Sequence, residues 1–88
     1  MSNMELDCGI AKARIDGWLD DELALPCEGG RRIFRFEGES CIVSTRELEG
    51  RSYGPYTLDR TGLEVAGQDN AVEEFMRLFT LRFISAGG

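Results

Sequence analysis

The sequence predicts an α+β fold, in which an antiparallel meander of three to four strands packs against a C-terminal helix and is flanked by a further N-terminal helix. Two patterns predict it. Apolar residues recur at helical spacing between positions 70 and 84, and apolar and polar residues alternate between turn residues from 31 to 66. With 88 residues, 42% of them hydrophobic, the chain suffices for one small core. We therefore predict a single domain, 1–88, with residues 1–6 and 85–88 as flexible ends.

The C-terminal helix is predicted from the densest apolar segment of the chain. Asn70 fits a helix N-cap, and Glu73, three residues later, completes a capping box. The apolar stripe that follows consists of Val72, Phe75, Met76, Phe79 and Phe83. We expect this stripe to pack across one face of the sheet. The end of the helix stays open, because residues 78–84 also alternate as a short strand would.

Residues 8–25 fit two local structures. A helical stripe is formed by Cys8, Ala11, Ile15, Trp18, Leu19 and Leu23. Asp16-Gly17 is instead typical of a two-residue hairpin turn, which would pair residues 10–15 with 18–25. We favour the helix, because the stripe continues past Gly17 and consecutive acids are poor strand formers. A short helix that begins at Asp16 is a third possibility.

The middle of the chain reads as strands and turns. Residues 31–36 alternate with a period of two, and Gly38 marks a tight turn. The further predicted segments are a strand at 40–46, a loop at 47–51, a strand at 53–58, a turn at 59–62 and a last strand at 63–66. Turns at this spacing are typical of an antiparallel meander.

Charge is the strongest hint about function. The net charge is −6, and residues 1–30 hold seven acidic residues against two basic ones. A negative field repels phosphate backbones, so direct nucleic-acid binding is disfavoured and a protein with a basic surface is the expected partner. We predict a small non-enzymatic protein-binding module, an inhibitor or adaptor of a nucleic-acid-handling partner. The candidate partner-binding residues are Asp16, Asp20, Asp21 and Glu22, with Trp18 as an anchor if it lies outside the core.

Little in the composition indicates catalysis or metal binding. The chain has no histidine and a single lysine, which leaves few groups to activate a nucleophile. Cys8, Cys27 and Cys41 lie 19 and 14 positions apart, a spacing that fits neither a zinc site nor a disulfide framework. We expect no catalytic, metal or cofactor site, and free thiols in a reducing cytoplasm. No leader or membrane-spanning run is found, whereas thiol reactivity and oligomeric state are left open.

The last four residues suggest an alternative function. Ser85-Ala86-Gly87-Gly88 resembles the tail of ubiquitin-like sulfur carriers, whose free diglycine is adenylated by a partner enzyme. The resemblance implies a carrier protein with a β-grasp fold and a helix near the middle of the chain. Here the best helix directly precedes the tail, so we favour a plain flexible end.

A second alternative is an accessory nucleic-acid-binding domain. The arginines Arg31, Arg32, Arg35, Arg46 and Arg51 are interleaved with Phe34, Phe36, Tyr53 and Tyr56, as in sheets that bind single strands. The order of elements, with Phe34-Arg35-Phe36 and a helix over 76–81, is similar to the small N-terminal domain of some DNA base-excision glycosylases. The helix-hairpin-helix catalytic part of that family is missing. We favour pairing of the arginines with glutamates on neighbouring strands.

Overall fold

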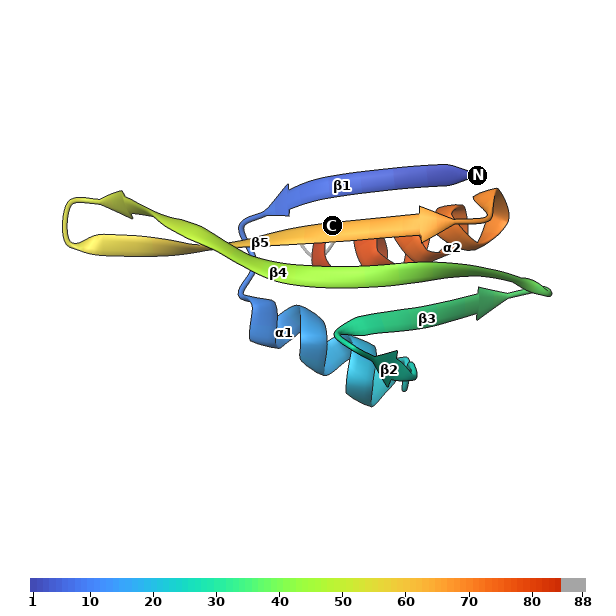
Figure 1. Ribbon diagram of the computed structural model, residues 1–88. Helices are drawn as coiled ribbons and strands as arrows, with labels where there is room; N and C mark the ends of the chain where they lie inside the picture. Colours follow the sequence, from blue (N-terminus) through green and yellow to red (C-terminus); the bar gives the residue numbers. More distant parts are fainter. Residues whose placement is uncertain (85–88) are drawn as a thin grey trace.

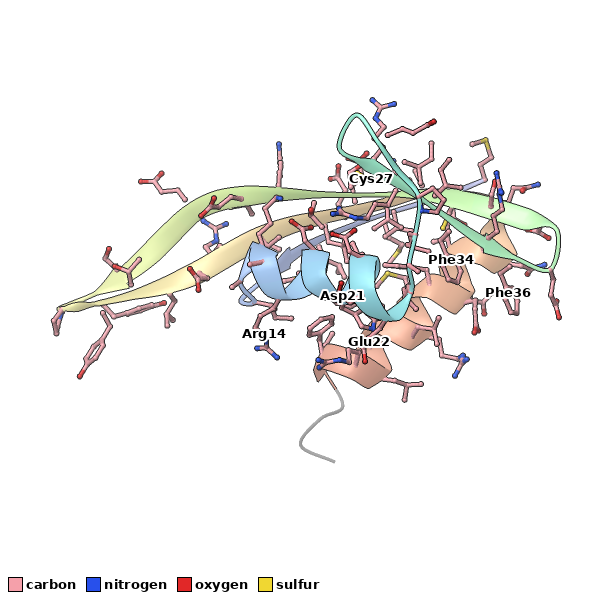
Figure 2. The ribbon with its side chains drawn as sticks, turned by 90° about the horizontal axis from the view of Figure 1, so that it is seen from below. Arg14, Asp21, Glu22, Cys27, Phe34 and Phe36 are labelled. Atoms are coloured by element: carbon pink, nitrogen blue, oxygen red, sulfur yellow. The ribbon has the colours of Figure 1, made fainter. Side chains whose placement is uncertain are left out.

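The computed structural model describes residues 1–84, without the side chain of Arg51. It has two layers, a sheet and a pair of helical segments that cover one of its faces (Figures 1 and 2). The elements are β1 (Ser2–Cys8), α1 (Lys12–Gly17), η1 (Trp18–Glu22), β2 (Cys27–Glu28), β3 (Arg31–Phe36), β4 (Glu39–Tyr53), β5 (Tyr56–Gly67), α2 (Asp69–Phe79) and η2 (Thr80–Ile84). The predicted α+β class with an antiparallel sheet is confirmed.

The sheet has five strands in the order β1-β5-β4-β3-β2, so the prediction of three to four was too low. Strands β3 to β5 form the predicted antiparallel meander, the unpredicted β2 pairs with β3, and β1 pairs with the outer edge of β5. The prediction of a flexible end at residues 1–6 was wrong, because these residues pair in register from Ser2↔Gly67 to Cys8↔Thr61. Only Leu6 and Cys8 of this strand pack toward the core. Two apolar residues are too few for the sequence pattern to indicate a strand.

Strands β4 and β5 are longer than predicted. The loop at 47–51 and the turn at 59–62 were wrong, because both segments continue the β4–β5 ladder. A single register shift between Leu48 and Arg51 absorbs one extra residue as a β-bulge, and the hairpin closes at Gly54-Pro55. The paired residues 47–60 project beyond the helices, and we call them the β4–β5 arm (Figure 1).

The predicted N-terminal helix is confirmed, and the hairpin alternative is wrong. Helix α1 runs through Gly17 into η1, a π-helical turn in which the Leu23 N–H donates to the Trp18 carbonyl at 3.1 Å. This path turns Ile15, Trp18 and Leu19 toward the sheet. Burial of these apolar side chains outweighs the poor helix propensity of Gly17.

The C-terminal helix begins earlier than predicted and has a different cap. Gln68 is the N-cap residue and makes no side-chain cap bond, so the predicted capping role of Asn70 was wrong. The Glu39 carboxylate instead accepts from the Asn70 backbone N–H at 3.3 Å and from its Nδ2 at 2.9 Å. The Glu39 carboxylate, at the start of β4, thus accepts from a backbone N–H of the first turn of α2 that has no partner within the helix. The strand alternative for residues 78–84 is also wrong, because α2 continues into the π-helical η2.

The core lies between the helical layer and one face of the sheet. The ring of Trp18 packs against Phe75, Phe79 and Phe83 with centroid distances of 5.7, 6.1 and 5.4 Å, and Phe34 packs on Phe75 at 5.5 Å. The strands supply Phe34, Cys41, Val43, Leu63 and Val65. Packing of the predicted aromatic stripe on the sheet is therefore confirmed. We call the opposite side of the sheet, which the described helices leave uncovered, the open face (Figure 2).

Candidate functional site

Two of the predicted acidic residues are held by a single buried arginine. The Arg32 side chain rises from the inner face of β3, where its Nε donates to Asp20 at 2.9 Å and its Nη1 to Asp16 at 3.3 Å. Asp16 also accepts from Lys12 at 2.6 Å and from Thr45 at 2.7 Å. A buried guanidinium needs such carboxylate partners. Asp16 and Asp20 therefore contribute to the structure, and much of their charge is compensated.

The pKa of the Asp16 carboxyl reflects this network. Partial burial alone would raise its pKa, but the hydrogen bonds from Lys12 and Thr45 and the charges of Lys12 and Arg32 outweigh burial. The pKa of Asp16 therefore lies below its ordinary value. The carboxylate stays charged at neutral pH, so it is poorly suited to proton transfer there.

The other predicted partner-binding residues have different environments. Asp21 is exposed, and Glu22 accepts from the Arg82 Nε at 3.2 Å, which joins η1 to η2 (Figure 2). Trp18 is only 6% exposed and belongs to the core, so the condition for its role as an anchor is not met. Its position follows from the helical stripe, because Ile15 and Leu19 lie on the same side of the helix.

An acidic depression that sequence reasoning missed lies between the β3–β4 turn and α2. It has a volume of about 440 Å³ and is lined by Phe36, Glu37, Asn70, Glu73, Glu74 and Arg77. We call it the acidic notch. The Arg77 Nε donates to Glu74 at 2.8 Å, whereas Glu37 and Glu73 form no ion pair among the described residues. Residues 37 and 73 are far apart in sequence, and only the packing of α2 on β3 brings them together.

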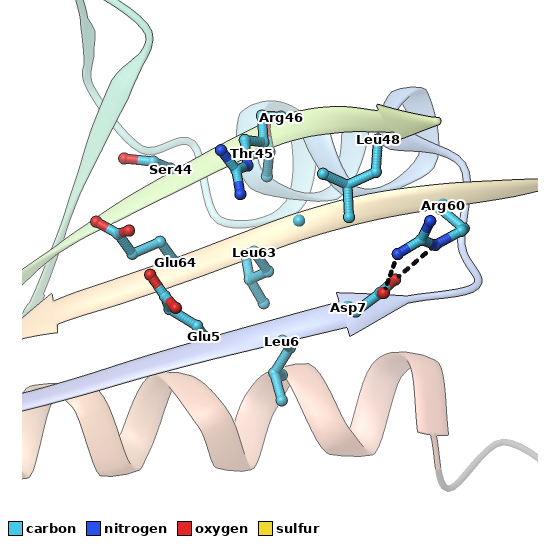
Figure 3. Close-up of a pocket in the computed structure, with 11 residues that line it drawn as sticks. Glu5, Leu6, Asp7, Ser44, Thr45, Arg46, Leu48, Arg60, Leu63 and Glu64 are labelled. Carbon is cyan, nitrogen blue, oxygen red and sulfur yellow. Dashed lines mark hydrogen bonds and ion pairs between the residues drawn. The ribbon is translucent and has the colours of Figure 1, made fainter. Parts of the chain in front are cut away.

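A second depression lies on the open face, above the strand position of Gly62 (Figure 3). Its volume is about 560 Å³, and its charged lining consists of Glu5, Asp7, Arg46, Arg60 and Glu64. The Arg60 guanidinium donates to both carboxylate oxygens of Asp7. Glu5 lies directly opposite Glu64 in the β1–β5 register, and neither carboxylate forms an ion pair within the described chain. This depression thus combines charges of both signs.

The β4–β5 arm exposes apolar surface. Tyr53 is 55% exposed, Tyr56 71% and Leu58 55%. Tyr53 and Tyr56 are register partners beside the Gly54-Pro55 turn, so the two rings lie on the same side of the arm. Sequence reasoning identified these tyrosines only as part of a possible nucleic-acid surface.

The arginine and aromatic residues of β3 do not form a single surface. Arg31 and Arg35 alternate with Phe34 along β3, where Phe34 is buried under the helices and the two arginines are exposed. A single-strand-binding sheet needs its aromatic rings beside the cations on one exposed face. The alternation of β3 separates them, which leaves Phe34 without a role in base stacking.

The three cysteines are free thiols in different environments. Cys8 and Cys41 are buried, and Cys27 is exposed on β2. Burial raises the pKa of Cys41 to about 11, and burial together with the nearby Asp7 charge raises the pKa of Cys8. Among residues 1–84, no group of three or more cysteine and acidic side chains is arranged to hold a metal ion. Gly87 and Gly88 lie outside the described residues.

Comparisons of this chain with protein-family models, with curated proteins and with solved structures find no match. Among the described elements, none of the helices has the length and apolar character needed to cross a membrane. The function is therefore argued from the chemistry of these surfaces.

Proposed function

We propose that this chain is a small non-enzymatic protein-binding module that docks on a basic partner surface through the acidic notch. The observation that carries the proposal is the excess of carboxylates there. Glu37, Glu73 and Glu74 line the notch together with the half-buried Phe36, and Arg77 pairs with Glu74 alone. Two carboxylates thus remain to accept a lysine or arginine side chain.

The notch also suits the shape of a basic side chain. Lysine and arginine carry an apolar stem below the charged group, and the Phe36 ring offers a surface for that stem. An aromatic ring also attracts the cation itself. Carboxylates beside a half-buried ring therefore match both parts of such a side chain.

The acids of η1 would add long-range attraction. Asp21 is exposed, and the Glu22 side chain, although paired with Arg82, is 57% exposed. Asp16 and Asp20 contribute less, because Arg32 and Lys12 neutralise them. Surfaces that bind phosphate backbones are basic, so an inhibitor or adaptor of a nucleic-acid-handling protein fits this charge. The exposed free thiol of Cys27 suits a reducing cytoplasm.

The proposal is tested with a fluorescently labelled peptide of alternating arginine and alanine. We expect salt-sensitive binding by fluorescence anisotropy, weakened in the double variant E37Q/E73Q. An exposed ion pair is worth about 0.2–1 kcal/mol, so loss of two should raise the Kd about two- to thirtyfold. Glutamine keeps the size of each side chain and removes only its charge.

The matched control is E47Q/E49Q, which removes the same charge from the exposed β4–β5 arm. The proposal requires this control to bind more tightly than E37Q/E73Q. Equal weakening of both variants would mean that net charge alone attracts the peptide, and would contradict a role for the notch.

A further inference from the structure

The open face carries two neighbouring rows of side chains that run across the strands. The first row is apolar and consists of Ile33, Ile42 and Ala66, which are successive register partners on β3, β4 and β5. The second row is charged, with Glu28 on β2, Arg31 on β3, Ser44 on β4, Glu64 on β5 and Glu5 on β1. Register partners in an antiparallel pair point to the same face. Ile42 is 42% exposed, so the apolar row meets solvent.

The charged row holds one cation, Arg31, with Glu28 on one side of it and the carboxylates of Glu64 and Glu5 on the other. Arg31 is exposed and forms no ion pair among residues 1–84, and the same holds for Glu5 and Glu64. Like charges directly opposite each other destabilise a strand pair, so a cation placed against the Glu5–Glu64 pair would be favourable. A second copy of the chain that presents the same row in reverse order would set its Arg31 against Glu5 of the first copy.

We infer that the open faces of two copies of this chain pack together as a homodimer, with a two-fold axis parallel to the strands and between β4 and β5. Such an axis sets β3 over β1 of the second copy and β4 over β5. Arg31 then faces Glu5 of the second copy twice, once on each side of the axis. In the apolar row, Ile42 faces Ala66 of the second copy.

The charged side chains favour this axis over a two-fold axis that runs across the strands. A two-fold axis running across the strands would set β1 over β1 of the second copy. Where such an axis crosses the charged row, the carboxylates of Glu5 and Glu64 and the guanidinium of Arg31 would each oppose their own copies. Like-charge contacts of this kind cost several kcal/mol in a packed interface. The axis parallel to the strands also matches the aligned packing of two sheets in a sandwich.

The β4–β5 arm extends the same face. From Gly62 outward, Arg60, Leu58 and Tyr56 occupy alternate positions of β5, and Tyr53 is the register partner of Tyr56. The same axis sets Tyr53 over Tyr56 of the second copy. Aromatic pairs of this kind add to the burial of apolar area. The dimer thus covers side chains that are 55% and 71% exposed in one copy.

The size of the face determines the expected strength. Strands β1, β5 and β4 over the β1–β5 register, with the part of β3 that reaches Arg31, give roughly 400 Å² at about 4.8 Å between strands and about 3.3 Å per residue. The arm raises this flat area to roughly 600 Å². Stable interfaces bury about 800 Å² per partner, so we expect a reversible dimer with a Kd on the order of 10–100 µM.

The test is a charge swap followed by analytical ultracentrifugation. The protein is studied from about 5 to about 500 µM, which brackets the expected Kd. The wild type should pass from monomer to dimer, and R31E and E5R should each weaken the dimer at least about tenfold. The double variant R31E/E5R restores both opposite-charge contacts, and its Kd should return to within about threefold of wild type.

The matched control is R14E, which makes the same charge change as R31E at an exposed arginine on α1, in the helical layer and away from the open face. It should dimerise as the wild type does. A wild type that stays monomeric at the highest concentration overturns the inference, as does a double variant that fails to regain the dimer. Equal weakening by R14E and R31E also overturns it. Circular dichroism of each variant checks that the fold is kept.

Discussion

At the scale of single residues, the environment of Arg32 decides the role of the acids around it. Its side chain is 9% exposed, and a guanidinium in such a place must be paired. Asp16 and Asp20 provide the pairing from α1 and η1, 16 and 12 residues earlier in the chain. Asp16 and Asp20, which the sequence suggests are part of an exposed acidic surface, therefore act in the folded chain as counter-ions of the buried Arg32.

The first prediction concerns the pH dependence of stability. Because the pKa of Asp16 is lower in the folded protein, its stabilising effect is present at neutral pH and disappears as pH falls below the ordinary carboxyl range, about 3.9. D16N should lower the free energy of unfolding by about 1–3 kcal/mol at pH 7. Urea unfolding of both proteins at neutral and acidic pH measures this difference. A difference that does not shrink in acid would contradict the assignment.

The second prediction concerns thiol reactivity. Cys8 and Cys41 are buried with raised pKa values, whereas Cys27 is exposed. Only thiolates react rapidly, so Ellman's reagent should modify one thiol quickly in the native protein and the other two after denaturation. C27S should remove the fast phase and leave the slow ones unchanged. A fast phase that survives in C27S would show that Cys8 or Cys41 is accessible.

At the scale of elements, the α2–η2 segment is organised by its aromatic stripe. Phe75 and Phe79 are fully buried, and Phe83 is half-buried at the end of the stripe. The guanidinium carbons of Arg14 and Arg82 lie 5.7 and 5.0 Å from the Phe83 ring centre. The stripe therefore runs from the dry core to an edge where the ring is covered by cations.

The third prediction follows from the decrease in burial along the stripe, from Phe75 to Phe83. F75A should lower the free energy of unfolding by about 3–5 kcal/mol, as is usual for a buried phenylalanine. F83A should cost about 1–2 kcal/mol, because solvent already reaches that ring. Urea denaturation of the two variants compares them directly. Equal losses would mean that Phe83 is as well packed as Phe75.

The connection between β5 and α2 requires a glycine at position 67. Gly67 has a φ of +155°, and a Cβ there would lie 2.5 Å from the Cα of Cys41 and 2.6 Å from the Ser40 carbonyl oxygen. The Gln68 N–H donates to that same carbonyl at 3.0 Å. A glycine is required here because the backbones of β4 and β5 meet closely just as the chain leaves the sheet.

At the scale of the whole molecule, the two sides of the sheet differ in charge. The side chains of the open face include four arginines (Arg31, Arg35, Arg46 and Arg60) and four acids (Glu5, Asp7, Glu28 and Glu64). The net charge of −6 therefore lies largely on the helical side and the arm. A balanced face suits contact with a second copy, and an acidic side suits a basic partner.

The two proposed surfaces work together without competing. The acidic notch belongs to α2 and the β3–β4 turn, so it stays exposed when two open faces pack. A dimer would present two notches to one partner, and bivalent binding is tighter than either single contact. Loss of the dimer in R31E should thus leave the notch of each copy intact, which keeps the two proposals separable by experiment.

Much of the fold follows from local pattern. The stripe from Val72 to Phe83 predicts a helix because its spacing matches a helical turn, and tertiary packing uses that stripe as expected. The alternation of β3 and the positive φ of Gly38 match the predicted strand and turn. The errors at 47–51 and 59–62 have one cause: polar residues and glycines resemble loops when a strand is paired but solvent-exposed.

The candidate site was harder to predict from the sequence than the fold. The sequence by itself determined the α+β class, the C-terminal helix, the aromatic stripe and the net negative charge, because each depends on composition or on neighbours a few residues apart. The tertiary structure decided which charges are free, since Arg32 pairs with Asp16 and Asp20 across the fold and Glu37 meets Glu73 only where α2 packs on β3. Charges interact through space, and strand register and helix packing set the distances between residues that are remote in the chain.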